Sequence, residues 1–166
     1  QFTVTEPNKV WTTDITYIRS KEGWLYLCVM LDLFSRRIVG WQTSTRIDRQ
    51  LVCDAFNYAL ARQGYPTGVM VHSDQGSQFT SNDYTKLLKK YNVSHSVSYR
   101  GSCVDNVPIE SWFSLLKCEI LKLHSNITRN QARQLVSDYV IYYNHHRLQE
   151  QLKELTPIQY RLSALN

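Results

Sequence analysis

Strand-like and helix-like patterns of hydrophobic residues alternate along the chain. Three segments near its start are rich in β-branched and aromatic residues and are separated by short turns, which predicts an antiparallel meander of three strands. We expect these strands at residues 10–19, 24–34 and 37–43. Two shorter apolar runs, at 69–72 and 93–97, predict a fourth and a fifth strand.

Helical periodicity separates the last two strands and dominates the remainder of the chain. A first helix is expected after Asp48, a good N-cap, and before the turn at 64–66. A second begins at Thr80, with Asp83 three residues later as in a capping box. Two helices are expected over 130–143 and 157–165. Before them, a long helix carries one apolar stripe: Ile109, Phe113, Leu116, Ile120 and Leu123.

The order βββαβαβααα predicts the fold class. Three hairpin-linked strands followed by alternating helix and strand give an α/β protein with a mixed five-stranded sheet flanked by helices. Ribonuclease H-like folds have this order, with the first strand central and the fourth parallel beside it. Neighbouring strands lie about 4.8 Å apart, so side chains of these two strands can share a site. We expect a single domain over residues 1–166.

Composition excludes several classes of protein. With 166 residues, 43% of them hydrophobic, the chain can build one core, so disorder and a small disulfide-stapled scaffold are excluded. No apolar run reaches the roughly 20 residues of a membrane helix. The four cysteines show no metal-type spacing, which indicates reduced thiols and an intracellular protein. The net charge of +5 favours a polyanionic partner such as nucleic acid. The first residue is Gln1 rather than Met, which indicates a piece of a longer protein.

Three carboxylates occupy positions typical of a functional site. Asp14 lies in the middle of the first strand, where an Asp costs stability unless it is paired or metal-bound. Asp74 directly follows the fourth strand, where open α/β sheets bind ligands. Glu110 lies in the first turn of the long helix. Each has an ordinary alternative in a salt bridge, a turn or a helix start. If all three converge, they indicate Mg²⁺ or Mn²⁺, because these cations prefer oxygen ligands.

These residues lie in motifs that resemble a known enzyme family. The segments TTDITYI, HSDQGSQFT and DNVPIESWFSLLKCE are similar to the catalytic core of the retroviral integrase superfamily, the DDE transposases. The tail YYNHHRLQEQLKELTPIQYR and the gap of 35 residues between Asp74 and Glu110 resemble the transposases of bacterial insertion sequences. The chain departs from the family at Val107, where a small residue is commoner, and in the loop Gly101-Ser102-Cys103.

The resemblance implies a mechanism and its cofactors. Asp14, Asp74 and Glu110 would be the catalytic residues and would hold two Mg²⁺ or Mn²⁺ ions. Two such ions can clamp the attacking and leaving oxygens of an in-line phosphoryl displacement. The implied protein is a DNA transposase or integrase core that cleaves transposon ends and joins them to target DNA. It would act as a homo-oligomer on DNA, in the bacterial cytoplasm and associated with the nucleoid. Recognition of the ends is expected in an N-terminal region that this chain lacks.

Four further residues are candidate DNA contacts. Lys117 lies seven residues after Glu110, on the same helix face, where the family places a basic residue that contacts DNA. Asn106 and Gln78 lie near the carboxylates in sequence. Arg147 belongs to a mixed aromatic and basic run at the end of a helix. A purely structural role stays open for each of them.

Asp32 and Glu119 are alternative candidates for the carboxylate site, and two other functions are alternatives to a transposase. Asp32 is expected to pair with Arg36 or Arg37 at the turn after the second strand. Glu119 lies nine residues after Glu110, on a different face of the helix. The alternative functions are a ribonuclease H-like nuclease that only hydrolyses and a domesticated DNA-binding module without catalysis.

Overall fold

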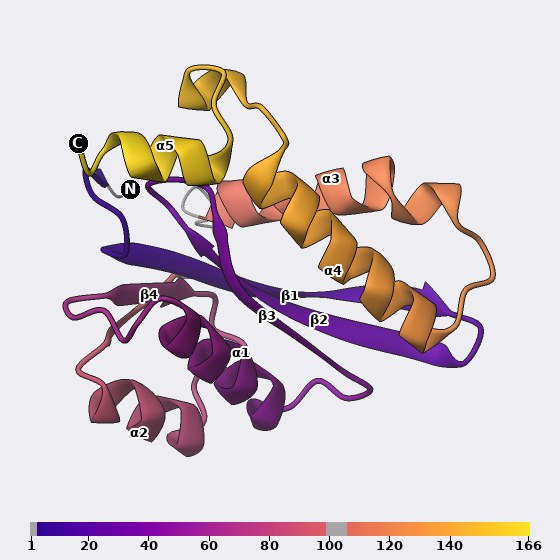
Figure 1. Cartoon of the computed structure of the whole chain (residues 1–166). Coiled ribbons are helices and arrows are strands. Elements are labelled where there is room, and N and C mark those ends of the chain that lie inside the picture. Colours follow the sequence, from indigo (N-terminus) through magenta and orange to yellow (C-terminus); the bar gives the residue numbers. More distant parts are fainter. Residues whose placement is uncertain (1–2, 99–105) are drawn as a thin grey trace.

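A mixed five-stranded sheet lies at the centre of the computed structural model, which describes residues 3–98 and 106–166 (Figure 1). The strands are β1 (Val10–Ser20), β2 (Gly23–Asp32), β3 (Ile38–Ser44), β4 (Met70–Ser73) and β5 (Ser94–Val97). Their spatial order is β3-β2-β1-β4-β5. Because β1 pairs antiparallel with β2 and parallel with β4, the first strand is central, as predicted.

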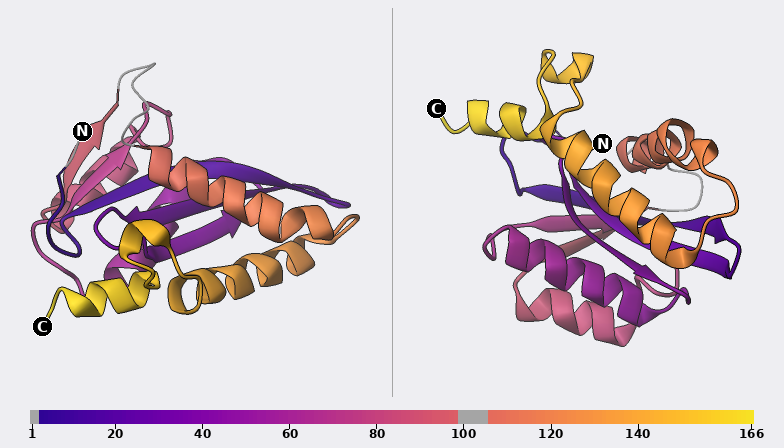
Figure 2. Two further views of the ribbon diagram at one scale, coloured as in Figure 1. Left: turned by 90° about the horizontal axis from the view of Figure 1, so that it is seen from above. Right: turned by 45° about the vertical axis from the view of Figure 1, so that its right-hand side comes forward.

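Helices cover both faces of this sheet (Figure 1). The first pair, α1 (Arg49–Arg62) and α2 (Asn82–Lys90), packs on one face. The second pair, α3 (Val107–Glu119) and α4 (Arg129–His145), packs side by side on the other face (Figure 2). The short turns η2 (Leu121–Leu123) and η3 (Glu150–Leu152) and the C-terminal helix α5 (Pro157–Ser163) complete the chain. No helix in the described part of the chain is long and apolar enough to cross a membrane.

The alternation of side chains along β2 produces two hydrophobic cores. Leu27 and Leu31 pack with α3 and α4, whereas Cys28 and Met30 pack with α1 and α2. The strand is thus buried on both faces, which explains its continuous apolar run.

Side-chain caps define where the first two helices begin. The carboxylate of Asp48 accepts the backbone N–H of Leu51 at the start of α1, as predicted. The second helix begins one residue later than predicted, because Ser81 and not Thr80 is its N-cap. The Ser81 hydroxyl accepts the backbone N–H of Tyr84.

The third helix ends earlier than its apolar stripe predicted. It stops at Glu119, and η2 then turns the chain towards α4. Ile120 still packs against the core, but the side chain of Leu123 is 74% exposed. Ile127 takes the next buried position after the chain has turned. The predicted loop at 99–104, with its departure at 101–103, lies outside the described residues.

The carboxylate of Asp32 has a different partner from the one predicted. It is fully buried and pairs with Arg161 of α5, whose Nη2 lies 3.0 Å from Asp32 Oδ2. Arg36 meets Asp32 through the backbone instead, because its N–H donates to the Asp32 carbonyl at 2.8 Å. The local turn therefore uses main-chain atoms, and the C-terminal helix neutralises the buried charge.

Asn144 of α4 covers the start of the edge strand β3. The side chain is buried, and its Oδ1 accepts the backbone N–H of Ile38 at 2.9 Å. Its Nδ2 donates to the carbonyl of the same residue at 3.0 Å. These two hydrogen bonds are the ones that a neighbouring strand would make.

Candidate active site

The parallel pairing of β1 with β4 brings Asp14 and Asp74 together. The register aligns Thr12 with His72, so two positions further along Asp14 lies level with Asp74, just past the end of β4. Oδ1 of Asp74 accepts the backbone N–H of Gly76 at 2.8 Å, which fixes the carboxylate at the turn. Asp14 is thus held on the central strand, and Asp74 is held in the turn that follows the neighbouring strand.

The start of α3 lies over the same part of β1 and carries the third carboxylate. The Thr12 hydroxyl donates to Oδ1 of Asn106 at 3.0 Å, and Asn106 is buried directly before α3. Glu110 lies in the first turn of this helix with an exposed side chain. Asn106 therefore ties the helix start to β1, two residues from Asp14. Whether Asn106 also contacts DNA stays a prediction.

The three carboxylates act on one another electrostatically. Burial raises the pKa of Asp14, the backbone N–H of Ile15 opposes this effect, and the negative charges of Asp74 and Glu110 raise it further. The resulting pKa is about 6, compared with 3.8 for an ordinary Asp. Burial and the two nearby carboxylates thus disfavour the ionisation of Asp14.

The donor set fits a divalent cation. Carboxylate oxygens are the ligands that Mg²⁺ and Mn²⁺ prefer, and a bound cation would relieve the repulsion around Asp14. Within residues 3–98 and 106–166, no three His, Cys, Asp or Glu side chains are grouped closely enough to hold a metal ion as they stand.

Gln78 packs at the turn that carries Asp74, whereas Lys117 lies further along α3 than Glu110. A Cβ on Gly76 would lie 2.5 Å from Nε2 of Gln78 and 3.0 Å from Oδ1 of Asp74, so both side chains pack against this glycine. Lys117 lies two turns after Glu110 on α3. Gln78 thus lies beside Asp74, and Lys117 lies about 10 Å along the helix from Glu110. Contact of either side chain with DNA stays a prediction.

Arg147 shares a groove with Glu110 but has a partner of its own. The groove measures about 750 Å³ and runs between α3 and the segment after α4. Nη2 and Nε of Arg147 donate to Oε1 of Glu119 at 2.8 and 3.0 Å, and the hydroxyl of Tyr139 donates to Oε2 at 2.7 Å. Burial raises the pKa of Glu119, but the hydrogen bonds from Arg147 and Tyr139 outweigh it and hold that pKa below its usual value. The pairing of Arg147 with Glu119 was not predicted from the sequence.

Models of a known protein family match the segments that contain these residues. A family model described as the integrase core domain matches residues 4–103, and a second with the same description matches residues 110–165. The chain belongs to the integrase core domain family. The first match contains Asp14 and Asp74, and the second begins at Glu110.

Curated relatives of this integrase core domain are transposases. It is 42% identical over 160 residues to the transposase InsF for insertion sequence IS3A of Escherichia coli (strain K12), covering 96% of this chain and 56% of that protein. It is also 42% identical over 157 residues to the transposase for insertion sequence element IS904 of Lactococcus lactis subsp. lactis (strain IL1403), covering 94% and 62%. The chain thus spans little more than half the length of these relatives.

Solved structures of retroviral integrases share the fold. The HTLV-2 integrase catalytic core domain in complex with magnesium, in its dimeric form, aligns with a TM-score of 0.75 at 18% identity, covering 94% of this chain and 97% of that one. The simian T-cell lymphotropic virus intasome in complex with PP2A regulatory subunit B56 gamma aligns with a TM-score of 0.81 at 18% identity, covering 95% and 55%. These alignments confirm the predicted ribonuclease H-like fold.

Proposed function

We propose that this integrase core domain is the catalytic domain of a DNA transposase, which cleaves DNA ends and joins them to target DNA by in-line phosphoryl transfer. One observation carries the proposal: the parallel register of β1 and β4 brings Asp14 level with Asp74, and burial, followed by the charges of Asp74 and Glu110, raises the pKa of Asp14. In a family whose curated relatives are transposases, three interacting carboxylates on β1, β4 and α3 are the groups expected to do this chemistry.

The proposal includes two Mg²⁺ or Mn²⁺ ions held by Asp14, Asp74 and Glu110. When bound, they would supply electrophilic stabilisation of the charge that develops on the phosphoryl oxygens. The strands β1 and β4 hold Asp14 and Asp74 in place, and Asn106 fixes the start of α3 through Thr12. Support for a divalent cation comes from the chemistry of these donors and from the HTLV-2 core, which was solved with magnesium.

The proposed substrates are transposon ends and target DNA, bound by a homo-oligomer. The integrase core of HTLV-2 is described in dimeric and trimeric forms, and the relatives are transposases. We propose Lys117, Asn106, Gln78 and Arg147 as DNA contacts. We further propose that residues 1–166 are one catalytic core, that another region of the longer protein recognises the ends, and that the protein works at the bacterial nucleoid in the cytoplasm.

Strand transfer by the full-length transposase tests this function. The substrate is a pre-cleaved DNA end with a free 3′-hydroxyl, which a true transposase joins to target DNA and a purely hydrolytic nuclease does not. Asp14→Asn, Asp74→Asn and Glu110→Gln should each abolish joining in Mg²⁺ and in Mn²⁺. Asp138→Asn, which changes an exposed carboxylate on α4, is the matched control and should join normally. Joining by any folded site variant would overturn the proposal, as would cleavage without joining by the unaltered protein.

A further inference from the structure

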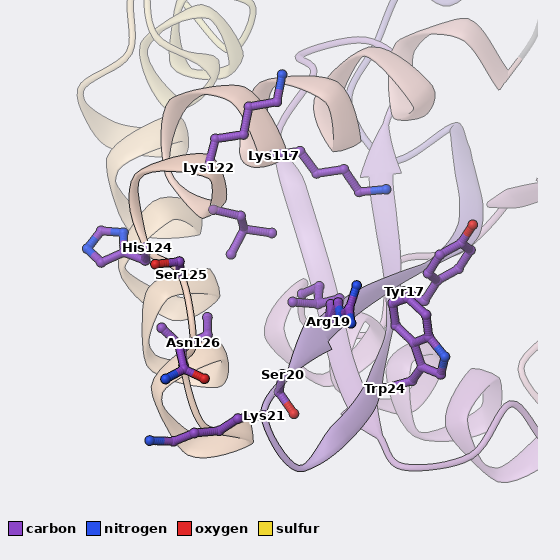
Figure 3. A pocket seen from close by; sticks show the side chains of 13 residues that line it. Tyr17, Arg19, Ser20, Lys21, Trp24, Lys117, Lys122, His124, Ser125 and Asn126 are labelled. Carbon is purple, nitrogen blue, oxygen red and sulfur yellow. The ribbon is translucent and has the colours of Figure 1, made fainter.

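A second hollow lies beyond the carboxylates, at the far end of β1 (Figure 3). Its volume is about 790 Å³. One side is lined by residues 17–21 of β1 and its turn and by Trp24 of β2, and the other by Lys117 of α3 and by residues of the segment 121–127 that joins α3 to α4. On this stretch β1 pairs with β2, while its pairing with β4 ends at Thr12. The hollow therefore occupies a part of the β1 edge that β4 does not reach.

The hollow concentrates positive charge. Arg19, Lys21, Lys117 and Lys122 line it, and the part of the lining that the structure describes contains no Asp or Glu. Glu22 turns to the start of α4, where its carboxylate accepts the backbone N–H of Arg129 at 2.8 Å. Four cations without a local carboxylate favour a polyanionic ligand.

Two exposed aromatic rings complete the lining. The side chains of Tyr17 and Trp24 are 56% and 46% exposed, and their rings meet edge to face with centroids 5.0 Å apart. Nζ of Lys117 lies 5.4 Å from the centre of the Tyr17 ring. Exposed rings beside cations are typical of surfaces that bind single-stranded nucleic acid, because bases stack on the rings and phosphates contact the cations.

The hollow is connected to the carboxylates through β1 and α3. Tyr17 follows Asp14 by three residues of strand, or about 10 Å, and Lys117 follows Glu110 by seven residues of helix, also about 10 Å. β1 and α3 run in the same direction (Figure 1), and their side chains meet again at the β1 edge, where Lys117 contacts Tyr17. Three residues of strand place Tyr17 on the opposite face of β1 from Asp14, so a DNA strand would pass from the carboxylates round this open edge to reach both rings. The offset of about 10 Å is about three nucleotides of a stacked DNA strand, which rises about 3.4 Å per nucleotide.

We propose that the hollow binds unpaired nucleotides of the DNA strand that passes the carboxylates. A base stacks on Trp24 and Tyr17, and the flanking phosphates contact Arg19, Lys117 and Lys122. The proposal rests on the proposed function, since DNA is the substrate. It adds a site that binds the bases of the strand as well as its phosphates.

Trp24 provides a direct optical test. It is an exposed indole, whereas Trp11 and Trp112 are fully buried. The 166-residue chain is titrated in EDTA with a single-stranded DNA oligonucleotide and with an abasic oligonucleotide of the same length. The DNA should quench the tryptophan fluorescence and bind roughly 5- to 150-fold more tightly than the abasic strand, the range for one stacked base. Equal affinity for both strands, or the same quenching in Trp24→Phe, would overturn the stacking.

Paired charge variants test the phosphate contacts. Arg19→Ala with Lys122→Ala removes two exposed cations from the hollow, and Lys86→Ala with Lys89→Ala removes two exposed cations from α2. The first pair should lower the slope of log affinity against log salt by about 1.4, because each single-strand contact contributes about 0.7. The second pair should leave it unchanged. If both double variants fold and lower the salt slope equally, only net charge determines the affinity, and the proposed phosphate contacts in the hollow are wrong.

These measurements separate this proposal from the proposed function. Binding in EDTA does not depend on metal at Asp14, Asp74 and Glu110. If the protein carries out strand transfer but binds the normal and the abasic strand equally well, only the proposal of nucleotide binding in the hollow is overturned. Base-dependent binding by a protein that never joins DNA would overturn the catalytic proposal and leave the hollow supported.

Discussion

Arg161 and Asp32 form a buried ion pair that joins the C-terminal helix to the end of β2. The Nη2–Oδ2 distance is 3.0 Å, and the same carboxylate oxygen accepts the Ser35 hydroxyl at 2.6 Å. Asp32 has no exposed surface, and Arg161 also donates to Gln63 at the end of α1. A helix at one end of the chain thus neutralises a charge buried in the sheet.

We expect Arg161→Ala to lower the free energy of unfolding by about 3–5 kcal/mol, because it leaves the Asp32 carboxylate buried without its partner. Urea denaturation measures this loss. Arg36→Ala is the matched control and should cost less, since the backbone bond from Arg36 to Asp32 remains. Equal losses in the two variants would contradict the assignment of Arg161 as the partner.

The raised pKa of Asp14 predicts that the metal-free fold loses stability as the pH rises. An unfolded Asp14 ionises near pH 3.8, whereas the folded one ionises near pH 6. The contribution of this group is therefore fully present below pH 4 and is lost between about pH 4 and 6, on the order of 3 kcal/mol. Urea denaturation in EDTA measures the free energy of unfolding of both proteins. Between pH 4 and 6, this free energy should rise for Asp14→Asn relative to the unaltered protein. A difference that does not change with pH would contradict the raised pKa.

Divalent cations should raise the melting temperature of the unaltered protein. A ligand that binds only the folded state stabilises it by about 2.7 kcal/mol at a hundred times its Kd. In EDTA, Asp74→Asn should melt higher than the unaltered protein, because it removes one repelling charge beside Asp14. It should also respond weakly to Mn²⁺, while the control Asp138→Asn responds normally. Identical melting and identical Mn²⁺ responses of Asp74→Asn and the unaltered protein would show that the carboxylates do not form one site.

Arg147 and Glu119 allow a structural role to be separated from a DNA contact. Both Arg147→Ala and Glu119→Gln should lower the free energy of unfolding by about 1–2 kcal/mol, because each breaks a charge-assisted hydrogen bond. Only Arg147→Ala should also reduce the salt slope of duplex DNA binding, by about one. If both variants leave that slope unchanged, Arg147 serves the fold alone.

Local patterns were sufficient to predict most of the fold. Alternating strand residues and helix caps such as Asp48 act within a few residues, so the succession of strands and helices along the chain follows from short segments. The spatial order of the strands followed from the ribonuclease H-like succession of these elements. The misplaced end of α3 and the partner of Asp32 depend on distant parts of the chain. Leu123 fits a helical stripe, but the chain has already turned towards α4 there, and Arg161 lies in the last helix.

The candidate site was also predicted only in part, because some of its features depend on contacts between distant parts of the chain. Asp14 and Asp74 meet because β1 and β4 are parallel neighbours, which the strand order predicted. The hollow beyond them was not predicted, because Tyr17 and Trp24 have high strand propensity and looked like ordinary strand residues. Only the structure shows that both rings are exposed and lie beside Lys117.

The hydrogen bonds between Asn144 and Ile38 also bear on self-association. An uncovered edge strand recruits strands from other molecules, and β3 is such an edge. At its first residue, the side-chain amide of Asn144 already occupies the N–H and C=O groups that an incoming strand would need. Asn144 of the C-terminal half therefore blocks the addition of a strand at the first residue of this edge. A fragment that ends before α4 would lose this cap together with the core residues of α4, and the start of its β3 edge would be open to the same edge of another copy.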